Sequence, residues 1–251
     1  MTTRESAVRI VVLAHDLLGT YGDLGNGAVL EARLRWRGIP AELIVHEGGR
    51  PVPADADLYL LGGGEDAPQT LAYAELSEGG GLSRALDRGA VLLGVCAGYQ
   101  LLGHRFGTND GRDVPGLGLL DVETVPGVGV PRAVGEIAVE PDQALGLPTL
   151  TGFENHAGRT HLGPGVEALG RVIAGVGNTG ADGTEGAYAG RVLGTYLHGP
   201  VLVRNPALAD LLLSWITGPL DPLTEPTVER LRRERLAAVN TGRSRQRAGR
   251  R

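Results

Sequence analysis

The sequence predicts an α/β fold in which helices flank a mostly parallel central sheet. Short apolar runs alternate with longer segments of helical pattern through the first part of the chain, and this alternation is typical of βαβ units. Several apolar runs are nearly continuous, as expected of strands that are buried on both faces. The 251 residues are enough to form one such core with appendages.

Strands are expected wherever apolar and β-branched residues form a short run. They lie at residues 7–14, 41–46, 58–61, 90–95, 117–125, 134–140 and 150–153, with a last strand inside 190–200. Helices are expected at residues 28–37, from residue 99 onward, at 205–216 and at 225–239. The basic residues of 241–251 predict a solvated, disordered tail, with weak contact to an anionic surface as the alternative.

Composition limits the class of protein. The net charge is −5 and aromatic residues are few, so the globular part has no nucleic-acid-binding signature. No apolar run approaches the roughly 20 residues that span a bilayer. The first residues lead into a strand without the apolar region of a signal peptide, and a single Cys leaves no internal disulfide. We therefore expect a cytoplasmic protein without a transmembrane segment.

The chain contains no Lys, and every basic residue other than His is Arg. A P-loop requires a Lys on the phosphates, so a Walker A site is excluded. Schiff-base chemistry on a lysine is excluded for the same reason. The glycines within residues 22–27 do not follow the G-x-G-x-x-G order of a dinucleotide-binding loop.

The only cysteine, Cys96, lies between a predicted buried strand and a predicted helix. Residues 94–98 read Gly-Val-Cys-Ala-Gly, which is the pattern of a nucleophile elbow with Cys in place of Ser. The sharp turn needs small neighbours, and it lifts the sulfur above the sheet beside the first N–H groups of the helix. A lone Cys elsewhere is usually an inert, buried apolar residue. In this setting we expect Cys96 to be a nucleophile.

Three consecutive glycines, residues 62–64, follow another predicted strand. They form either an ordinary flexible turn or part of a site, because ligands of open α/β sheets bind outside the carboxyl ends of the strands. We expect the N–H groups of Gly63 and Gly64 to face the same rim as Cys96. One of them would then join the N–H of Ala97 in stabilising an oxyanion.

His198 follows the last predicted strand and is placed to meet the Cys96 elbow across the rim. Two further histidines, His156 and His161, belong to the polar segment 154–161. A third ligand at suitable spacing is missing, so we predict hydrogen-bonded or solvated histidines there and no metal site.

The motifs around Cys96 and His198 (residues 94–100 and 196–200) together resemble the class I, triad-type glutamine amidotransferases of the branch related to cobyric acid synthase. Three further stretches, residues 21–26, 33–38 and 152–160, are similar to the GatD-type subunits of lipid II isoglutaminyl synthases. The resemblance spans residues 7–216. It implies a flavodoxin-like three-layer amidotransferase domain at residues 1–218, followed by an Arg-rich helix and tail at 219–251.

The resemblance implies roles for single residues. Cys96 would attack the side-chain amide of glutamine, with His198 as its acid–base partner. Arg132 occupies the position that binds substrate glutamine, and a guanidinium there can hold the α-carboxylate through two hydrogen bonds. Gln100, within the motif after Cys96, is counted among the substrate-binding candidates with Gly63, Gly64 and Ala97.

One position departs from the family pattern. Most relatives have a Glu two residues after the His, where it orients the imidazole, and this chain has Pro200. Pro has no side-chain acceptor. Either a carboxylate elsewhere in the chain or one from a partner subunit would complete the triad, and we expect the partner to supply it.

Released ammonia has no evident use in a chain without an ATP motif. A partner is therefore expected, which the resemblance makes an ATP-dependent, Mur-ligase-like subunit of the MurT type, in a heterodimer that binds ATP and Mg²⁺ on the partner. That partner would amidate the D-glutamate α-carboxyl of the lipid II stem peptide during peptidoglycan synthesis. Two alternatives stay open, namely a cobyrinate-type acceptor and a non-catalytic regulatory subunit.

Overall fold

A computed structural model describes residues 6–20 and 22–248, with residues 240–248 described by their backbone alone. Its central element is a six-stranded sheet in the order β13-β14-β4-β3-β1-β2. The strands are β1 (Val8–Leu13), β2 (Ala41–Val45), β3 (Leu58–Leu61), β4 (Val91–Val95), β13 (Ala187–Ala189) and β14 (Val192–Thr195). All neighbours are parallel except β13, which runs antiparallel to β14.

The order of the five parallel strands, β2-β1-β3-β4-β14, is that of a flavodoxin-like sheet. It confirms the predicted fold class. In such a sheet the strand order reverses between β1 and β3, and ligands bind at the carboxyl ends near this point. The loops that leave β1 and β3 therefore lie beside the loop that leaves β4.

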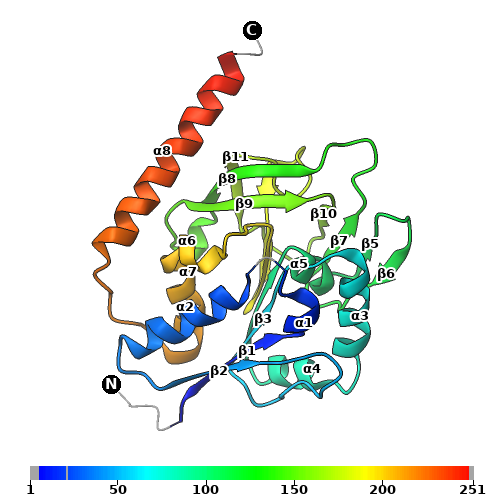
Figure 1. Cartoon of the computed structure of the whole chain (residues 1–251), viewed down its shortest axis with the longest axis vertical. Coiled ribbons are helices and arrows are strands. Elements are labelled where there is room, and N and C mark those ends of the chain that lie inside the picture. The colour runs from blue at the N-terminus through cyan, green and yellow to red at the C-terminus, as the bar shows by residue number, and fades with distance from the viewer. Residues whose placement is uncertain (1–5, 21, 249–251) are drawn as a thin grey trace.

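Helices cover both faces of this sheet (Figure 1). The helices α2 and α7 contact each other on one side, and α3 contacts α1 and α5 on the other. The helices around the central sheet are α1 (His15–Leu18), α2 (Leu24–Arg35), α3 (Asp66–Ser77), α4 (Gly81–Asp87), α5 (Ala97–Leu102), α6 (Val201–Arg204) and α7 (Pro206–Thr217). Strands β1, β3 and β4 are almost entirely buried between them.

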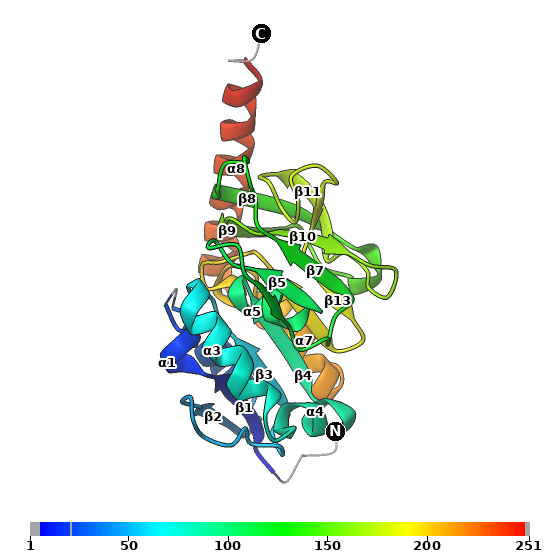
Figure 2. The same cartoon turned by 90° about the vertical axis from the view of Figure 1, so that its right-hand side faces the viewer.

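Two smaller sheets, which the sequence did not distinguish from the main sheet, extend the molecule beyond the carboxyl ends of the parallel strands (Figure 2). One has the order β10-β7-β5-β6 and the other β12-β11-β8-β9. Their strands are β5 (Arg105–Gly107), β6 (Asp113–Pro115), β7 (Val122–Val125), β8 (Ala133–Pro141), β9 (Leu150–His156), β10 (Arg159–Leu162), β11 (Gly170–Ala174) and β12 (Thr184–Glu185). A short 3₁₀ turn, η1 (Gln143–Leu145), joins β8 to β9.

An ion-pair network joins α2 to α7 and to the segment before the last helix. Arg33 is 4% exposed and pairs with Asp210 at 2.7 Å and with Glu225 at 2.6 Å. Arg37 pairs with the same Asp210 at 2.8 Å. Because a buried guanidinium without partners is costly, this pairing accounts for Arg33 and Arg37 of the 33–38 motif as structural residues.

The last helix, α8 (Pro226–Ala248), differs from the sequence prediction. It continues well past residue 239, where an unstructured tail was expected from residue 241. The added residues include Arg, Gln and Ala, which favour helix, and extending an existing helix costs far less than nucleating a new one. Residues 249–251 of the predicted tail lie outside the described residues.

Helix α8 contacts β8 and β11 and then extends beyond the sheets (Figure 1). Within the described parts of the chain, no helix has the length and apolar character needed to cross a membrane. Helix α7 ends at Thr217, one residue before the predicted domain boundary at 218. The division into an amidotransferase domain and a C-terminal appendage stays a prediction.

Candidate active site

Cys96 occupies a strained turn between β4 and α5. Its backbone has φ 55° and ψ −107°, which L-residues rarely adopt. A Cβ on Gly98 would lie 2.4 Å from the carbonyl oxygen of Leu61, and one on Gly94 would lie 2.8 Å from the backbone of Gly98. Both glycines are therefore required by close packing. The strand–turn–helix elbow predicted from residues 94–98 is confirmed.

The Cys96 thiol is buried, and burial raises its pKa to about 12. The N–H of Ala97 and the charge of Arg132 favour the thiolate, whereas the charge of Asp23 opposes it. At neutral pH the sulfur is therefore protonated in this structure. Attack on a substrate requires a base that removes the proton.

His198 follows β14 and is 5% exposed. Its Nδ1 lies 2.8 Å from the carbonyl oxygen of Tyr196 and 2.9 Å from that of Phe153. A carbonyl only accepts hydrogen bonds, so Nδ1 bears the proton and Nε2 bears the lone pair. Burial lowers the pKa of His198. The imidazole is therefore neutral and in the tautomer that a base acting through Nε2 requires.

The backbone brings Cys96 and His198 to neighbouring strand ends. Strands β4 and β14 are parallel, with Val95 opposite Thr195. The N–H of Cys96 donates to the carbonyl of Thr195 at 2.9 Å. Strand β9 approaches from the second sheet, because Phe153 and His198 exchange two backbone hydrogen bonds of 3.0 and 3.1 Å.

Arg132 lies just before β8, and its guanidinium is held by Asn155 of β9. Its Nε donates to Asn155 Oδ1 at 2.7 Å, and one terminal nitrogen donates to the Asn155 carbonyl at 3.1 Å. Its charge reaches Cys96 and also contributes to the lowered pKa of His198. The structure thus brings Arg132 to the same site as the predicted nucleophile and base.

The predicted role of Gly63 is corrected by the structure. Its N–H donates to Asp23 Oδ2 at 2.7 Å inside the protein, and the preceding carbonyl, of Gly62, accepts from Gly98 N–H at 3.0 Å. Gly63 N–H is therefore not directed at a substrate. Sequence reasoning missed Asp23 because a carboxylate at the start of α2 reaches this loop only in the folded chain.

The side-chain amide of Gln100, predicted as a substrate-binding residue, is engaged within the protein. Its Oε1 accepts from Gln69 at 3.0 Å, and its Nε2 donates to the Tyr196 hydroxyl at 3.1 Å. Gln69 also donates to the carbonyl of Ala97 at 3.2 Å. Both ends of the Gln100 amide are thus used inside the chain, where they support the segment next to His198.

A buried polar layer behind His198 was not predicted. The Tyr196 hydroxyl lies 2.7 Å from the hydroxyl of Thr160, and His156 stacks on the Tyr196 ring with centroids 3.7 Å apart. Burial lowers the pKa of His156 to about 3, so this histidine is neutral. Its Nδ1 bonds to the Gly158 carbonyl at 3.0 Å, whereas His161 on β10 is exposed.

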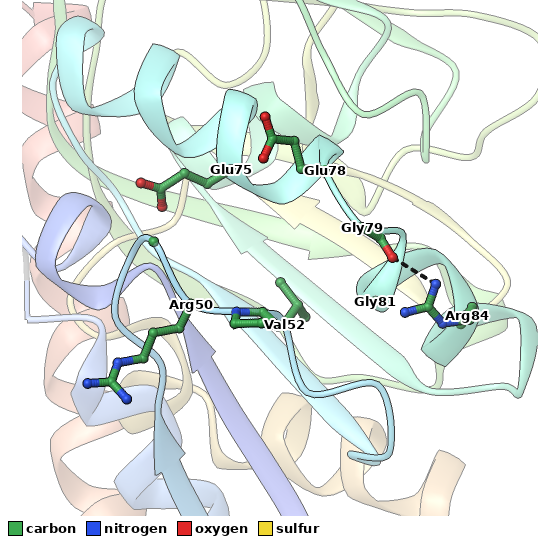
Figure 3. A pocket seen from close by; sticks show the side chains of 9 residues that line it. Arg50, Val52, Glu75, Glu78, Gly79, Gly81 and Arg84 are labelled. Atoms are coloured by element: carbon green, nitrogen blue, oxygen red, sulfur yellow. Dashed lines mark hydrogen bonds between the residues drawn. The ribbon is translucent and has the colours of Figure 1, made fainter.

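Other candidate features lie elsewhere or outside the description. A surface pocket of about 290 Å³ is formed where residues 49–52 face the ends of α3 and α4. Figure 3 shows Glu75 of α3 and Glu78, which directly follows α3, at this pocket, with Arg84 bonded to the Gly79 carbonyl at 2.7 Å. None of the predicted site residues lines it. Tyr21, which opens one of the family motifs, lies outside the described residues.

Comparisons with known proteins agree with this geometry. A sequence model of the CobB/CobQ-like glutamine amidotransferase domain matches residues 9–206. The GatD subunit of lipid II isoglutaminyl synthase (glutamine-hydrolyzing) of Staphylococcus aureus is 39% identical over 200 residues, which are 79% of each chain. The subunit of the same name from Streptococcus pneumoniae is 31% identical over 82% of this chain and 79% of that one.

More distant relatives and structures extend the comparison. The cobyric acid synthase of Pelotomaculum thermopropionicum is 34% identical over 86% of this chain, which corresponds to 41% of that protein. A crystal structure of a glutamine amidotransferase shares the fold with a TM-score of 0.57 at 23% identity, covering 84% of this chain and all of the other. By sequence and by fold, this chain belongs to the CobB/CobQ-like glutamine amidotransferase family.

Proposed function

We propose that the chain is a glutaminase subunit that hydrolyses L-glutamine through a Cys96 thioester and passes ammonia to a separate ligase subunit. The observation that carries this proposal is the pairing of the strained Cys96 turn with a neutral His198 whose Nδ1 proton is fixed by two carbonyls. Arg132 beside them fits a clamp for the α-carboxylate of glutamine.

The reaction has two halves. His198 Nε2 takes the thiol proton as Cys96 Sγ attacks the side-chain amide carbon, and the N–H of Ala97 stabilises the resulting oxyanion. The imidazolium then gives its proton to the departing nitrogen, and the C–N bond breaks to leave ammonia and a γ-glutamyl thioester. In the second half His198 deprotonates water, which attacks the thioester. Glutamate leaves, and the proton returns to Cys96.

For the acceptor we propose the D-glutamate α-carboxyl of the lipid II stem peptide, since two relatives named as lipid II isoglutaminyl synthase subunits match most of the chain. Activating a carboxylate consumes ATP, so we place ATP and Mg²⁺ on a Mur-ligase-like partner in a heterodimer and locate the pair in the cytoplasm, where ATP is available. A cobyrinate-type acceptor is the second candidate, because cobyric acid synthases also match.

We further propose that this partner completes the catalytic triad. The two carbonyls that hold His198 are acceptors without a full charge. They select the tautomer, but they stabilise an imidazolium less than a carboxylate does. With Pro200 in the usual Glu position, an Asp or Glu of the partner near His198 would add that charge.

The test is to purify the chain with the ligase subunit that accompanies it and to compare it with Cys96→Ala. We expect the variant to lose glutamine hydrolysis and glutamine-dependent amidation, while amidation driven by added ammonium salts is retained. The retained activity shows that the complex is intact. A wild-type pair that consumes no glutamine, or a Cys96→Ala pair that still does, contradicts the proposal. A regulatory subunit would change only the ammonium-driven rate.

A further inference from the structure

The start of α2 contains two buried polar side chains to which the proposed reaction assigns no role. Asp23 is 3% exposed and Asn26 is 1% exposed. Both belong to the 22–26 stretch of the family-like motifs. They lie at the carboxyl ends of β1 and β3, where a flavodoxin-like sheet places its ligand site.

Asp23 determines which way the glycine loop after β3 presents its N–H groups. The peptide that joins Gly62 and Gly63 is held from both sides, because its carbonyl accepts from Gly98 and its N–H donates to Asp23. A Cβ on Gly62 would lie 2.7 Å from Asp23 Oδ2, so the loop rests directly on the carboxylate. Turning Gly63 N–H toward Cys96 would break a buried, charge-assisted hydrogen bond.

The next N–H group in the loop belongs to Gly64. Within residues 6–20 and 22–248, no hydrogen bond is made by this N–H. Gly64 follows the held peptide on the rim that also bears Cys96. Once Gly63 is occupied, Gly64 is the loop donor that remains to face an oxyanion.

Asn26 connects the same carboxylate to the His198 side of the site. Its Nδ2 donates to Asp23 Oδ1 at 3.2 Å, and its Oδ1 accepts from the N–H of Leu202 in α6 at 3.0 Å. The neighbouring Gly25 packs on Pro200 so closely that a Cβ would lie 2.6 Å from the ring. A continuous chain of contacts therefore runs from the glycine loop to the residues that follow His198.

We infer that Asp23 and Asn26 are positioning residues of the glutaminase site. Asp23 holds Gly63 so that Gly64 N–H, together with Ala97 N–H, stabilises the oxyanion. Asn26 fixes the position of this loop relative to the segment that follows His198. The inference rests on the proposed function and adds to it the identity of the second oxyanion donor.

The electrostatics support a functional reason for retaining Asp23. Burial raises the pKa of Asp23 to about 6, which means that its charge is held in an unfavourable environment. The same charge raises the pKa of Cys96 and so opposes the thiolate. A neutral side chain at position 23 would avoid both the buried charge and the raised pKa of Cys96. The hydrogen bond by which Asp23 holds the glycine loop offsets these two costs.

The experiment exchanges the two side chains in the full-length chain bound to its ligase partner. Asp23→Asn leaves one buried N–H group without an acceptor, whichever way the two amides are turned. Asn26→Asp places two carboxylates against each other. In the double variant D23N/N26D, the amide at 23 accepts from Gly63 and donates to the carboxylate at 26, which also accepts from Leu202, so every contact is restored.

Kinetics and a transition-state analogue give the readout. Removing an oxyanion donor lowers kcat by about 10²–10³-fold, and we expect each single variant to approach this loss. KM should change by less than about threefold, because the ground-state amide gains little from these donors. The inhibition constant of the γ-aldehyde analogue of glutamine, whose adduct with Cys96 bears an oxyanion, should rise in parallel with the loss of kcat. The double variant should regain at least about tenfold of kcat.

Asp57→Asn is the matched control. The side chain of Asp57 also accepts a backbone hydrogen bond, from the N–H of Arg9 at 2.9 Å. Asp57 lies before the start of β3, however, whereas the glycine loop follows the end of that strand. We expect this variant to retain wild-type kcat. If Asp23→Asn behaves like Asp57→Asn, or if the exchange restores nothing, the inference is wrong. If wild-type protein neither hydrolyses glutamine nor is labelled at Cys96 by an electrophilic glutamine analogue, the proposed function itself fails.

Discussion

Cys96 and His198 lie at the ends of neighbouring parallel strands, yet their surroundings are built in different ways. The Cys96 turn is marked by glycines next to it in sequence, because a side chain at 94 would meet the Gly98 backbone and one at 98 would meet the Leu61 carbonyl of β3. The His198 imidazole is held from the outside, in part by the carbonyl of Phe153 on β9, 45 residues away in sequence. The proposed nucleophile is thus held within the central sheet, whereas the proposed base also depends on how the second sheet packs.

The difference teaches where regulation can act. A turn packed this closely against the neighbouring strand of its own sheet has few alternative conformations. A side chain oriented by a strand of another sheet responds to any shift of that sheet. A subunit that binds near β8 and β9 would therefore change the base before it changes the nucleophile.

The largest effect that we expect from this difference is a rise in the kcat of glutamine hydrolysis when the proposed partner binds. We expect the isolated chain to hydrolyse glutamine slowly and the complex to have a higher kcat. Because the tautomer of His198 is already correct, the gain should be smaller than the about 10⁴-fold effect of a lost orienting acceptor in a Ser-His-Asp enzyme. Glutaminase assays of the chain with and without the partner measure it.

Exchange of partner carboxylates near His198 for their amides provides the control for this prediction. It should return kcat toward that of the isolated chain while leaving the complex assembled. Full activity of the chain alone would show that the internal carbonyls suffice and that no outside carboxylate is needed.

Arg132 tests the substrate side of the site. Arg132→Ala removes a charged partner for the α-carboxylate, and a hydrogen bond to a charged group contributes about 1.5–3 kcal/mol, so KM for glutamine should rise about 10–100-fold with a smaller change in kcat. The control is Arg112→Ala, since Arg112 is exposed and pairs with Asp110 at 2.9 Å. Unchanged glutamine kinetics would show that another group binds the carboxylate.

The contrast between the two proposed catalytic residues also explains what the sequence could predict. The elbow was predictable because the close packing that it needs leaves a mark in the sequence, the glycines around Cys96. The mostly parallel sheet followed from the alternation of strands and helices, and the family resemblance implied its flavodoxin-like arrangement. His198 was predictable as a histidine at a strand end, but the carbonyls that hold it belong to the tertiary structure.

The internal contacts of two other site candidates could not be predicted for the same physical reason. Gly63 and Gln100 were assigned to the substrate because they lie in suggestive motifs, and both are engaged by residues distant in sequence, Asp23 and Gln69. No local pattern encodes such contacts. The C-terminal helix was underestimated for a different reason, since charge density was given more weight than the helix preference of Arg, Gln and Ala.

The pH dependence of stability tests the role of Glu185, which bonds to the residues just before His198. It is fully buried, and its Oε1 accepts from the Thr195 hydroxyl at 2.9 Å and from the Tyr196 N–H at 2.6 Å. Burial raises its pKa to about 7. The folded protein therefore binds more protons than the unfolded chain between about pH 4.5 and 7, so the contribution of Glu185 to stability is lost as pH rises through this range.

For the wild type, this group should lower the free energy of unfolding by up to about 3 kcal/mol between pH 4.5 and 8. Glu185→Gln should remove that part of the slope, which urea unfolding at several pH values measures. Glu140→Gln is the control, because Glu140 is exposed and pairs with Arg171 at 2.5 Å. Equal slopes in the wild type and Glu185→Gln would mean that Glu185 is ionised in the folded protein throughout.

The smallest effect is expected at the far end of α8. The middle of this helix is attached to the body, with Arg235 at 3.8 Å from Glu136 of β8 and Val239 buried. The helix then continues past the two smaller sheets (Figure 1). Removing residues 241–251 should therefore change kcat/KM for glutamine by no more than about twofold, as for other surface changes.

The matched control for this truncation removes all of α8 from Pro226 onward. It also deletes Val239 and the Arg232 contact to the Thr149 carbonyl, so we expect it to lower the thermal midpoint while the shorter truncation does not. Assays of both variants with the partner, at low and high salt, show whether the basic residues of 241–251 are only solvated or contact the partner. If the protein that lacks only residues 241–251 loses activity relative to the wild type at low salt but not at high salt, the end of α8 belongs to the partner interface, because a charged contact that is strong only at low ionic strength is the expected signature of such a surface.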